Sequence, residues 1–115
     1  MKEKKGGGEM KRVYLYCSAG MSTSMLASKM QSVADNHKLP IEVKAFPDGK
    51  VDEIVEKFHP DVILLGPQVK YKFDDINVRH GQNVPVQVID QQAYGVMDGE
   101  KVLKSAIRLM KQNKK

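Results

Sequence analysis

Short apolar runs alternate with amphipathic stretches from Arg12 to the end of the chain. The apolar runs are rich in β-branched and aromatic residues and predict four strands, at Val13–Cys17, Ile41–Phe46, Asp61–Leu65 and Pro85–Asp90. Helical periodicity predicts helices at 22–36, 51–58 and 68–80, and another from about Asp98 onwards. Strands that are separated by helices run parallel with right-handed crossovers, so the helices cover both faces of the sheet. We therefore predict an α/β fold, a single domain with an open four-stranded parallel sheet.

Individual residues indicate the apolar face, the caps and the ends of the predicted helices. The apolar face of the first helix is predicted to contain Met25, Leu26, Met30 and Val33. Asp48 is suited to cap the second helix, and Pro60 to end it. Pro67 suits the first turn of the third helix, and Gly81 suits its end.

The basic charge of the chain lies at its two ends. The formal net charge is +5, but residues 1–12 and 111–115 together carry +6, while residues 13–110 carry −1. A nucleic-acid-binding domain typically gathers its basic residues on a folded surface, so we expect no nucleic-acid partner. The charged, triple-glycine segment 1–11 is predicted to be a flexible tail, and residues 12–112 to form the domain.

Length and cysteine count narrow the kind of site that the chain can carry. A chain of 115 residues builds one core, so a site must lie on the loops of a compact fold. One cysteine excludes an internal disulfide, and no Cys/His spacing of a zinc site is present. The N-terminus lacks an apolar signal core, and no run approaches the ~20 apolar residues of a spanning helix. We expect a cytoplasmic protein that needs no metal.

Cys17 stands where the first predicted strand meets a turn of small and hydroxyl-bearing residues. The turn consists of Ser18, Ala19, Gly20, Met21, Ser22, Thr23 and Ser24. The N–H groups at a helix start lack internal partners and lie at the positive end of the helix dipole, so they favour phosphate and thiolate. Ligands of open α/β sheets bind beyond the carboxyl ends of the strands, where this turn is expected. We predict that Cys17 is a nucleophile and that residues 18–24 form a phosphate-binding loop.

The predicted loop lacks the cation of a cysteine phosphatase. Those enzymes use Cys-x5-Arg, in which the arginine grips the phosphoryl oxygens, whereas Thr23 occupies that position here. No Lys or Arg lies between Arg12 and Lys29, and no Asp lies in the loop. A covalent phosphoryl group is then expected to wait for an acceptor instead of being hydrolysed. The residues leave open a low-molecular-weight phosphatase-like enzyme and a non-catalytic anion-binding module, while the missing second cysteine argues against a dithiol reductase.

Several separate blocks give the chain a family resemblance. The blocks are Cys17–Ser24, Ala45–Pro47, Val62–Gln68, Val88–Asp90 and Tyr94–Gly95. Together they resemble the enzyme IIB component of the lactose/cellobiose (chitobiose) branch of the bacterial sugar phosphotransferase system, from about Arg12 to Met110.

That resemblance implies a phosphoryl relay. In the family, a phosphohistidine of enzyme IIA phosphorylates the cysteine at the end of the first strand. The group then passes to a sugar, imported by the membrane enzyme IIC. Carried onto this chain, Cys17 is the phosphocysteine, the loop 18–24 surrounds the phosphoryl oxygens, and no cofactor is implied. The resemblance also implies transient contact with the membrane through enzyme IIC, and suggests a β-linked disaccharide such as cellobiose, chitobiose or lactose.

Other polar residues at the expected site edge receive secondary roles. Gln68 and Tyr94 are candidates for docking the partner proteins. Asp90 is interpreted as a helix cap or turn residue in preference to a general base. His37, His59 and His80 are interpreted as helix-end residues and not as catalytic ones. Met21 is a candidate for an exposed contact, and Met25 is expected to pack in the core or at its rim.

Overall fold

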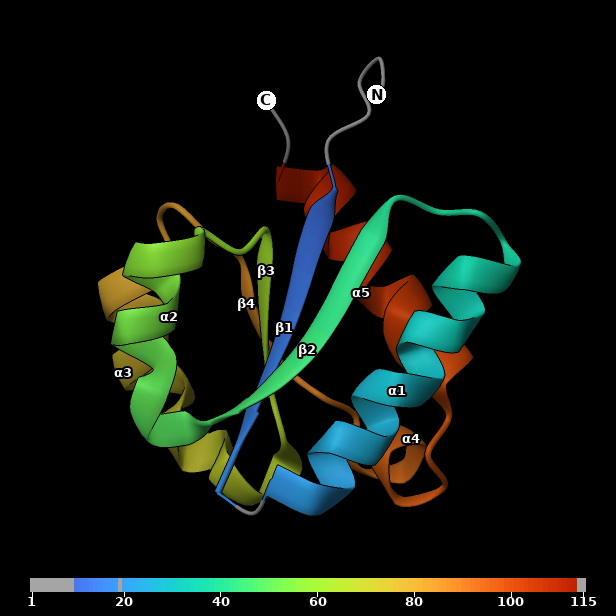
Figure 1. Cartoon of the computed structure of the whole chain (residues 1–115). Coiled ribbons are helices and arrows are strands. Elements are labelled where there is room, and N and C mark those ends of the chain that lie inside the picture. Colours follow the sequence, from blue (N-terminus) through green and yellow to red (C-terminus); the bar gives the residue numbers. More distant parts are fainter. Residues whose placement is uncertain (1–9, 19, 114–115) are drawn as a thin grey trace.

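Four parallel strands form an open sheet at the centre of the molecule (Figure 1). The structure is a computed structural model that describes residues 10–18 and 20–113, with the backbone alone for residues 20–22 and 113. The strands are β1 (Lys11–Cys17), β2 (Ile41–Pro47), β3 (Val62–Leu65) and β4 (Val86–Val88). Their order is β2-β1-β3-β4, and every neighbouring pair is parallel. The predicted α/β fold with an open parallel sheet is confirmed.

Helices cover both faces of this sheet. The helices are α1 (Gly20–Asn36), α2 (Val51–Phe58), α3 (Phe73–His80), α4 (Gln91–Gly95) and α5 (Gly99–Asn113), with 3-10 helices η1 (Asp48–Lys50) and η2 (Pro67–Lys72). In Figure 1, α1, α4 and α5 lie on one side of the strands, and α2 and α3 lie on the other. Within the described ranges, no helix combines the length and the apolar character that crossing a bilayer requires.

Two apolar cores follow from the alternation of side chains along the strands. Successive strand residues point to opposite faces, so β1 contributes to both cores. The first core lies under α1, α4 and α5 and includes Val13, Leu15, Leu26, Met30, Leu64, Tyr94 and Leu103. The second core lies under α2 and α3 and includes Tyr14, Tyr16, Ile54, Ile63, Leu65, Val69 and Ile76. The buried strand β1 thus joins the two layers.

The buried face of α1 differs from the predicted one at Met25. Leu26 and Met30 are buried and Val33 packs against the first core, but Met25 is 53% exposed. Thr23 takes its place in the buried stripe, because positions 23, 26, 27 and 30 share one side of a 3.6-residue helix. Of the two expected positions for Met25, in the core or at its rim, the core position is therefore wrong.

The structure also corrects two predicted helix features. Asp48 does not cap α2, because it lies in η1 and its carboxylate pairs with Lys72 instead. The third predicted helix is two elements, since η2 contains a non-helical residue, Val69, before α3 begins at Phe73. Gly81 follows the end of α3 as expected, although its φ of −63° is not the left-handed conformation of a glycine cap.

Some strand and tail boundaries shift by a few residues. β1 begins at Lys11 and β3 at Val62, whereas β4 spans only Val86–Val88 of its predicted range. Residues 1–9 of the predicted N-terminal tail lie outside the described residues.

Candidate functional site at the carboxyl edge of the sheet

Cys17 lies at the edge of the sheet where all four parallel strands end. It is the last residue of β1, it is paired with Pro47 at the end of β2, and α1 begins three residues later at Gly20. Gly66 follows β3 at the same edge, and its N–H donates to the Tyr16 carbonyl, 2.8 Å away. The Cys17 side chain is 0% exposed. The thiol is thus held in a covered position by the ends of three central segments.

Gln68 contacts the buried sulfur from the surface. The Cys17 Sγ donates a hydrogen bond to Gln68 Oε1 across 3.3 Å, although the glutamine itself is exposed. Gly66 makes this approach possible, because a Cβ there would lie 2.9 Å from Gln68 Oε1 and 3.1 Å from Cys17 Sγ. Both distances are shorter than ordinary van der Waals contact, so a side chain at position 66 would displace the end of Gln68 and press on the buried sulfur.

Tyr94 approaches the sulfur from inside the molecule. Its hydroxyl lies 4.0 Å from Cys17 Sγ and 3.1 Å from Thr23 Oγ1. Tyr94 is 7% exposed and Thr23 is 0% exposed, so this contact is shielded from water. One arrangement satisfies these groups together: Thr23 donates to Tyr94, Tyr94 donates to the sulfur, and the sulfur donates to Gln68. A chain of neutral donors therefore passes through the thiol.

Much of the predicted phosphate-binding loop forms the first turn of α1. The helix begins at Gly20, two residues before its predicted start at 22, and Thr23 and Ser24 are helical. Ser18 and Ser24 are exposed, whereas the Thr23 hydroxyl is directed at Tyr94. Ala19 and the side chains of Gly20, Met21 and Ser22 lie outside the described residues. Phosphate binding by this segment stays a prediction.

The two predicted docking residues have different positions. Gln68 is exposed at the site edge, whereas Tyr94 is buried in α4 and contacts the sulfur instead of the surface. Tyr94 lies in the short helix α4, and its docking role stays a prediction. Its partner Thr23 is 71 positions away in sequence, and no local pattern signals a contact of that separation.

Asp90 positions the short helix that carries Tyr94. Its carboxylate accepts a hydrogen bond from the Ala93 N–H at 2.9 Å, the geometry of an N-cap. The cap role preferred for Asp90 is confirmed. Sequence periodicity missed α4 because five residues are too few to show a helical face.

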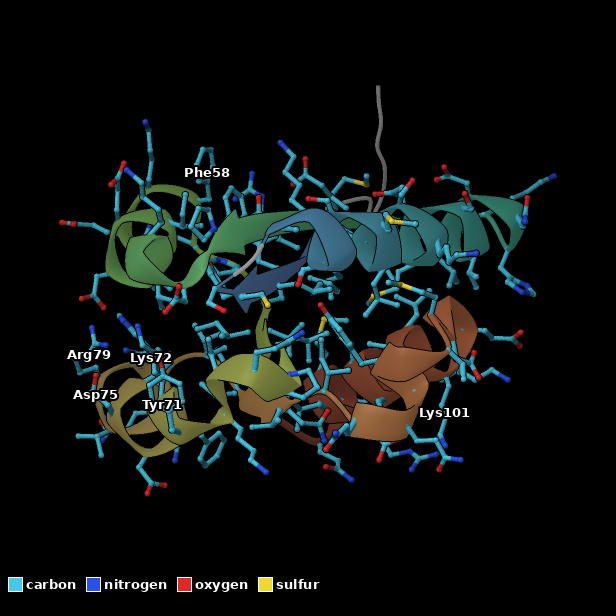
Figure 2. The ribbon with its side chains drawn as sticks, turned by 90° about the horizontal axis from the view of Figure 1, so that it is seen from below. Phe58, Tyr71, Lys72, Asp75, Arg79 and Lys101 are labelled. Carbon is cyan, nitrogen blue, oxygen red and sulfur yellow. The ribbon has the colours of Figure 1, made fainter. Side chains whose placement is uncertain are left out.

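Several ion pairs lie on the α2/α3 side of the sheet. Arg79 pairs with both Asp52 and Asp75, and His80 donates to Asp52 at 2.6 Å. Figure 2, which looks onto the site edge from below, shows Lys72, Asp75 and Arg79 together on the α3 side. Within the described part of the chain, the hydrogen-bonding side chains that contact Cys17 Sγ are Gln68 and Tyr94, both neutral.

The three histidines also lie outside the site. His37 follows the end of α1, His59 caps the end of α2 with a φ of 51°, and His80 ends α3. Because these helices run antiparallel to the strands, their C-terminal ends lie at the opposite edge of the sheet from Cys17. Their positions fit the helix-end interpretation.

The chain is similar to proteins of one known family. The family described as "PTS system, Lactose/Cellobiose specific IIB subunit" matches residues 12–105. The chain is 38% identical over 102 residues to the oligo-beta-mannoside-specific EIIB component of Bacillus subtilis (strain 168), covering 88% of this chain and 97% of the relative. It is 40% identical over 104 residues to the cellobiose-specific EIIB component of Lactococcus lactis subsp. lactis (strain IL1403), covering 87% and 96%.

Solved structures agree with this assignment. A cellobiose-specific phosphotransferase IIB component from Borrelia burgdorferi matches with a TM-score of 0.76 and 32% identity, covering 94% of this chain and 97% of that one. A lactose-specific IIB domain from Streptococcus pneumoniae shares the fold, with a TM-score of 0.78 and 16% identity over 88% and 98% of the two chains. The chain belongs to the lactose/cellobiose-specific IIB family of the sugar phosphotransferase system.

Proposed function

We propose that this protein is a cytoplasmic phosphoryl carrier that accepts a phosphoryl group on Cys17. The donor is a phosphohistidine of enzyme IIA, and the acceptor is a sugar imported by the membrane enzyme IIC. The observation that carries the proposal is the position of Cys17, a cysteine at the end of a central strand immediately before α1, in a chain of the IIB family. The protein then acts as a protein-phosphocysteine sugar phosphotransferase component.

The chemistry is a nucleophilic displacement at phosphorus. The Cys17 sulfur, as a thiolate, forms the S–P bond while the N–P bond of the phosphohistidine breaks. The proton lost by the thiol is balanced by the proton that the freed imidazole nitrogen takes up. The second transfer breaks the S–P bond and forms an O–P bond to a sugar hydroxyl, and the proton that the hydroxyl loses is balanced by the proton that the freed thiolate takes up.

Features of the site favour transfer over hydrolysis. The chain has no Lys or Arg between Arg12 and Lys29, so the loop lacks the guanidinium with which phosphatases stabilise the hydrolytic transition state. Neutral groups at the sulfur hold the phosphoryl group without activating water.

The relatives indicate the kind of sugar. Their names specify oligo-beta-mannosides, cellobiose and galactose. A β-linked disaccharide or short oligosaccharide such as cellobiose, chitobiose or lactose is therefore the proposed class of acceptor.

The proposal is tested by incubating the protein with phosphorylated enzyme IIA of this branch and measuring its intact mass. We expect one added phosphoryl group, located at Cys17 by peptide mapping and missing from the Cys17→Ser variant. The opposite result is no transfer from any cognate donor, together with steady hydrolysis of an aryl phosphate. That result would indicate that the protein is a phosphatase and not a phosphoryl carrier.

A further inference from the structure

The contact between Gln68 and Cys17 is specific for the protonated thiol. The sulfur donates its proton to Gln68 Oε1, a carbonyl oxygen that only accepts hydrogen bonds. When the thiol ionises, its proton passes to water, the electron pair stays on sulfur, and the sulfur becomes an acceptor. Two acceptors 3.3 Å apart then face each other without a proton between them. The observed orientation of the Gln68 amide does not suit the reactive form.

The NH₂ group of the same amide suits the thiolate. A glutamine side chain has two N–H donors opposite its carbonyl oxygen, and rotation about its last torsion exchanges them. The exposure of Gln68 leaves space for that rotation. Gly66 keeps the amide close to the sulfur in both orientations, because no side chain separates the two.

Tyr94 differs from Gln68 in this respect. Its hydroxyl donates to the sulfur or accepts from it by rotating a single proton, so it suits both forms without moving a heavy atom. Of the two described side chains that hydrogen-bond with the sulfur, Gln68 is therefore the one whose amide orientation depends on whether the sulfur is protonated.

We propose that Gln68 is a catalytic residue whose side-chain amide reverses when Cys17 ionises. Its carbonyl holds the thiol, and its NH₂ group then donates to the thiolate and afterwards to the phosphoryl group on sulfur. The amide takes up no proton and works by hydrogen bonding alone. The thiolate part of this proposal stands on the Gln68–Cys17 geometry, whereas the phosphoryl part rests on the proposed function.

The thiolate part is tested by NMR of the protein with ¹⁵N-labelled glutamine side chains. As pH rises through the ionisation of Cys17, we expect the Gln68 NH₂ resonances to shift, and we expect no such shift in the Cys17→Ser variant. Gln92, an exposed glutamine in α4, serves as an internal reference. Gln68 resonances that shift equally in the Cys17→Ser variant, or do not shift at all, would overturn the proposal.

Alkylation by iodoacetamide at one fixed pH gives a second readout. Gln68→Met keeps about the size of glutamine and has neither a charge nor an N–H donor for the thiolate, so we expect alkylation to slow by about tenfold, the effect of losing one hydrogen bond to a charged group. The matched Gln92→Met variant makes the same change in α4, two residues before Tyr94, and is expected to react within about twofold of the wild type. Equal rates in all three proteins contradict a role in stabilising the thiolate.

Phosphorylation kinetics separate catalysis from docking. With phosphorylated enzyme IIA as substrate, we expect Gln68→Met to lower kcat by at least about tenfold and to change KM little. A rise in KM with unchanged kcat would assign Gln68 to docking and overturn the catalytic role. If wild-type protein accepts no phosphoryl group, the proposed function fails, while the NMR and alkylation results still decide the role of Gln68.

Discussion

The buried hydroxyl groups on the two faces of the sheet differ in their hydrogen bonding. In the first core, the hydroxyls of Thr23 and Tyr94 bond each other, and Tyr94 also reaches the sulfur. In the second core, the Tyr16 hydroxyl is buried and has no hydrogen-bond partner among the described residues. One face thus organises its polar atoms around Cys17, whereas the other buries a hydroxyl without a contact that the structure shows.

Ionisable groups on the α2/α3 side pair with one another. Tyr14 donates to Glu42 at 3.0 Å. Burial, followed by this hydrogen bond, raises the pKa of the Tyr14 phenol to about 12. The ion pairs of Asp52 with Arg79 and His80 lie at the surface of the same side.

The side chains that contact the sulfur come from both sides of the sheet. Tyr94 belongs to the first core, whereas Gln68 lies in η2 beside Val69 of the second core. The polar contacts of Cys17 therefore join the two sides.

The largest predicted effect comes from Gly66, where the sulfur and Gln68 meet. Gly66→Ala is expected to cost about 1–3 kcal/mol of unfolding free energy, because the added Cβ presses on the buried Cys17 side chain, whereas the exposed end of Gln68 can move aside. The backbone there has a φ of −61°, so the loss is steric and does not arise from the torsion angles. Urea denaturation measures it.

The matched control for this substitution is Gly95→Ala. A Cβ at Gly95 meets nothing within 4 Å, and the residue lies in α4 near the same edge. We expect it to be neutral or stabilising by up to about 1 kcal/mol. Equal losses at Gly66 and Gly95 would show that the site tolerates bulk beside the sulfur.

The hydroxyl pair of the first core gives the next effect. Tyr94→Phe is expected to destabilise the protein by about 1–2 kcal/mol, since Thr23 loses a buried partner. Thr23→Val should cost a similar amount, and the double variant should cost less than the sum of the two. Additive losses in this double-mutant cycle would mean that the two hydroxyls act independently.

Tyr16→Phe tests the opposite face with the same chemical change. Burial raises the pKa of the Tyr16 phenol, and its hydroxyl has no partner in the described structure, so removal is expected to be neutral or to stabilise by up to about 1 kcal/mol. Thermal unfolding beside Tyr94→Phe makes the comparison direct. A loss as large as that of Tyr94→Phe would remove the difference between the two faces.

The smallest effect is expected at the surface of the second face. The hydrogen bond from His80 is the largest cause that holds the pKa of Asp52 below its ordinary value of 3.8. Because the folded pKa is lowered, the contribution to stability is complete above 3.8 and is lost as pH falls through the folded value. Asp52→Asn is expected to cost about 0.5 kcal/mol near neutral pH, since Asp52 is exposed.

The check is urea denaturation of wild type and Asp52→Asn at neutral pH and at about pH 3, below the ordinary carboxylate pKa. The difference between the two proteins should shrink at the lower pH. If the difference in unfolding free energy is the same at both pH values, the ionised carboxylate of Asp52 is not its cause.

The sequence was sufficient to predict the fold and the position of Cys17 at the end of its first strand. Alternation of apolar runs and helical faces reports burial directly, and the four strands were found for that reason. Cys17 was identified because its strand-end position is local information. The break at Val69 was missed, because a 3-10 segment keeps the apolar spacing of the helix that follows it.

The remaining parts of the site depend on contacts between distant segments. Gln68 and Tyr94 lie 51 and 77 positions from Cys17 in sequence, so a single chain gives no pattern that joins them. Thr23 illustrates the same limit. Its hydroxyl was assigned to the loop, but its helical position turns it inward toward Tyr94.

The strand order has a consequence for how copies of this protein behave at high concentration. The outer strands are β2, which presents Glu42 and Lys44 and ends in Pro47, and β4, which is three residues long. Charges, proline and short length are features that prevent strand addition at a sheet edge. Neither edge offers a long uncharged template for another chain, so crowding is not expected to drive amyloid-like stacking through this sheet.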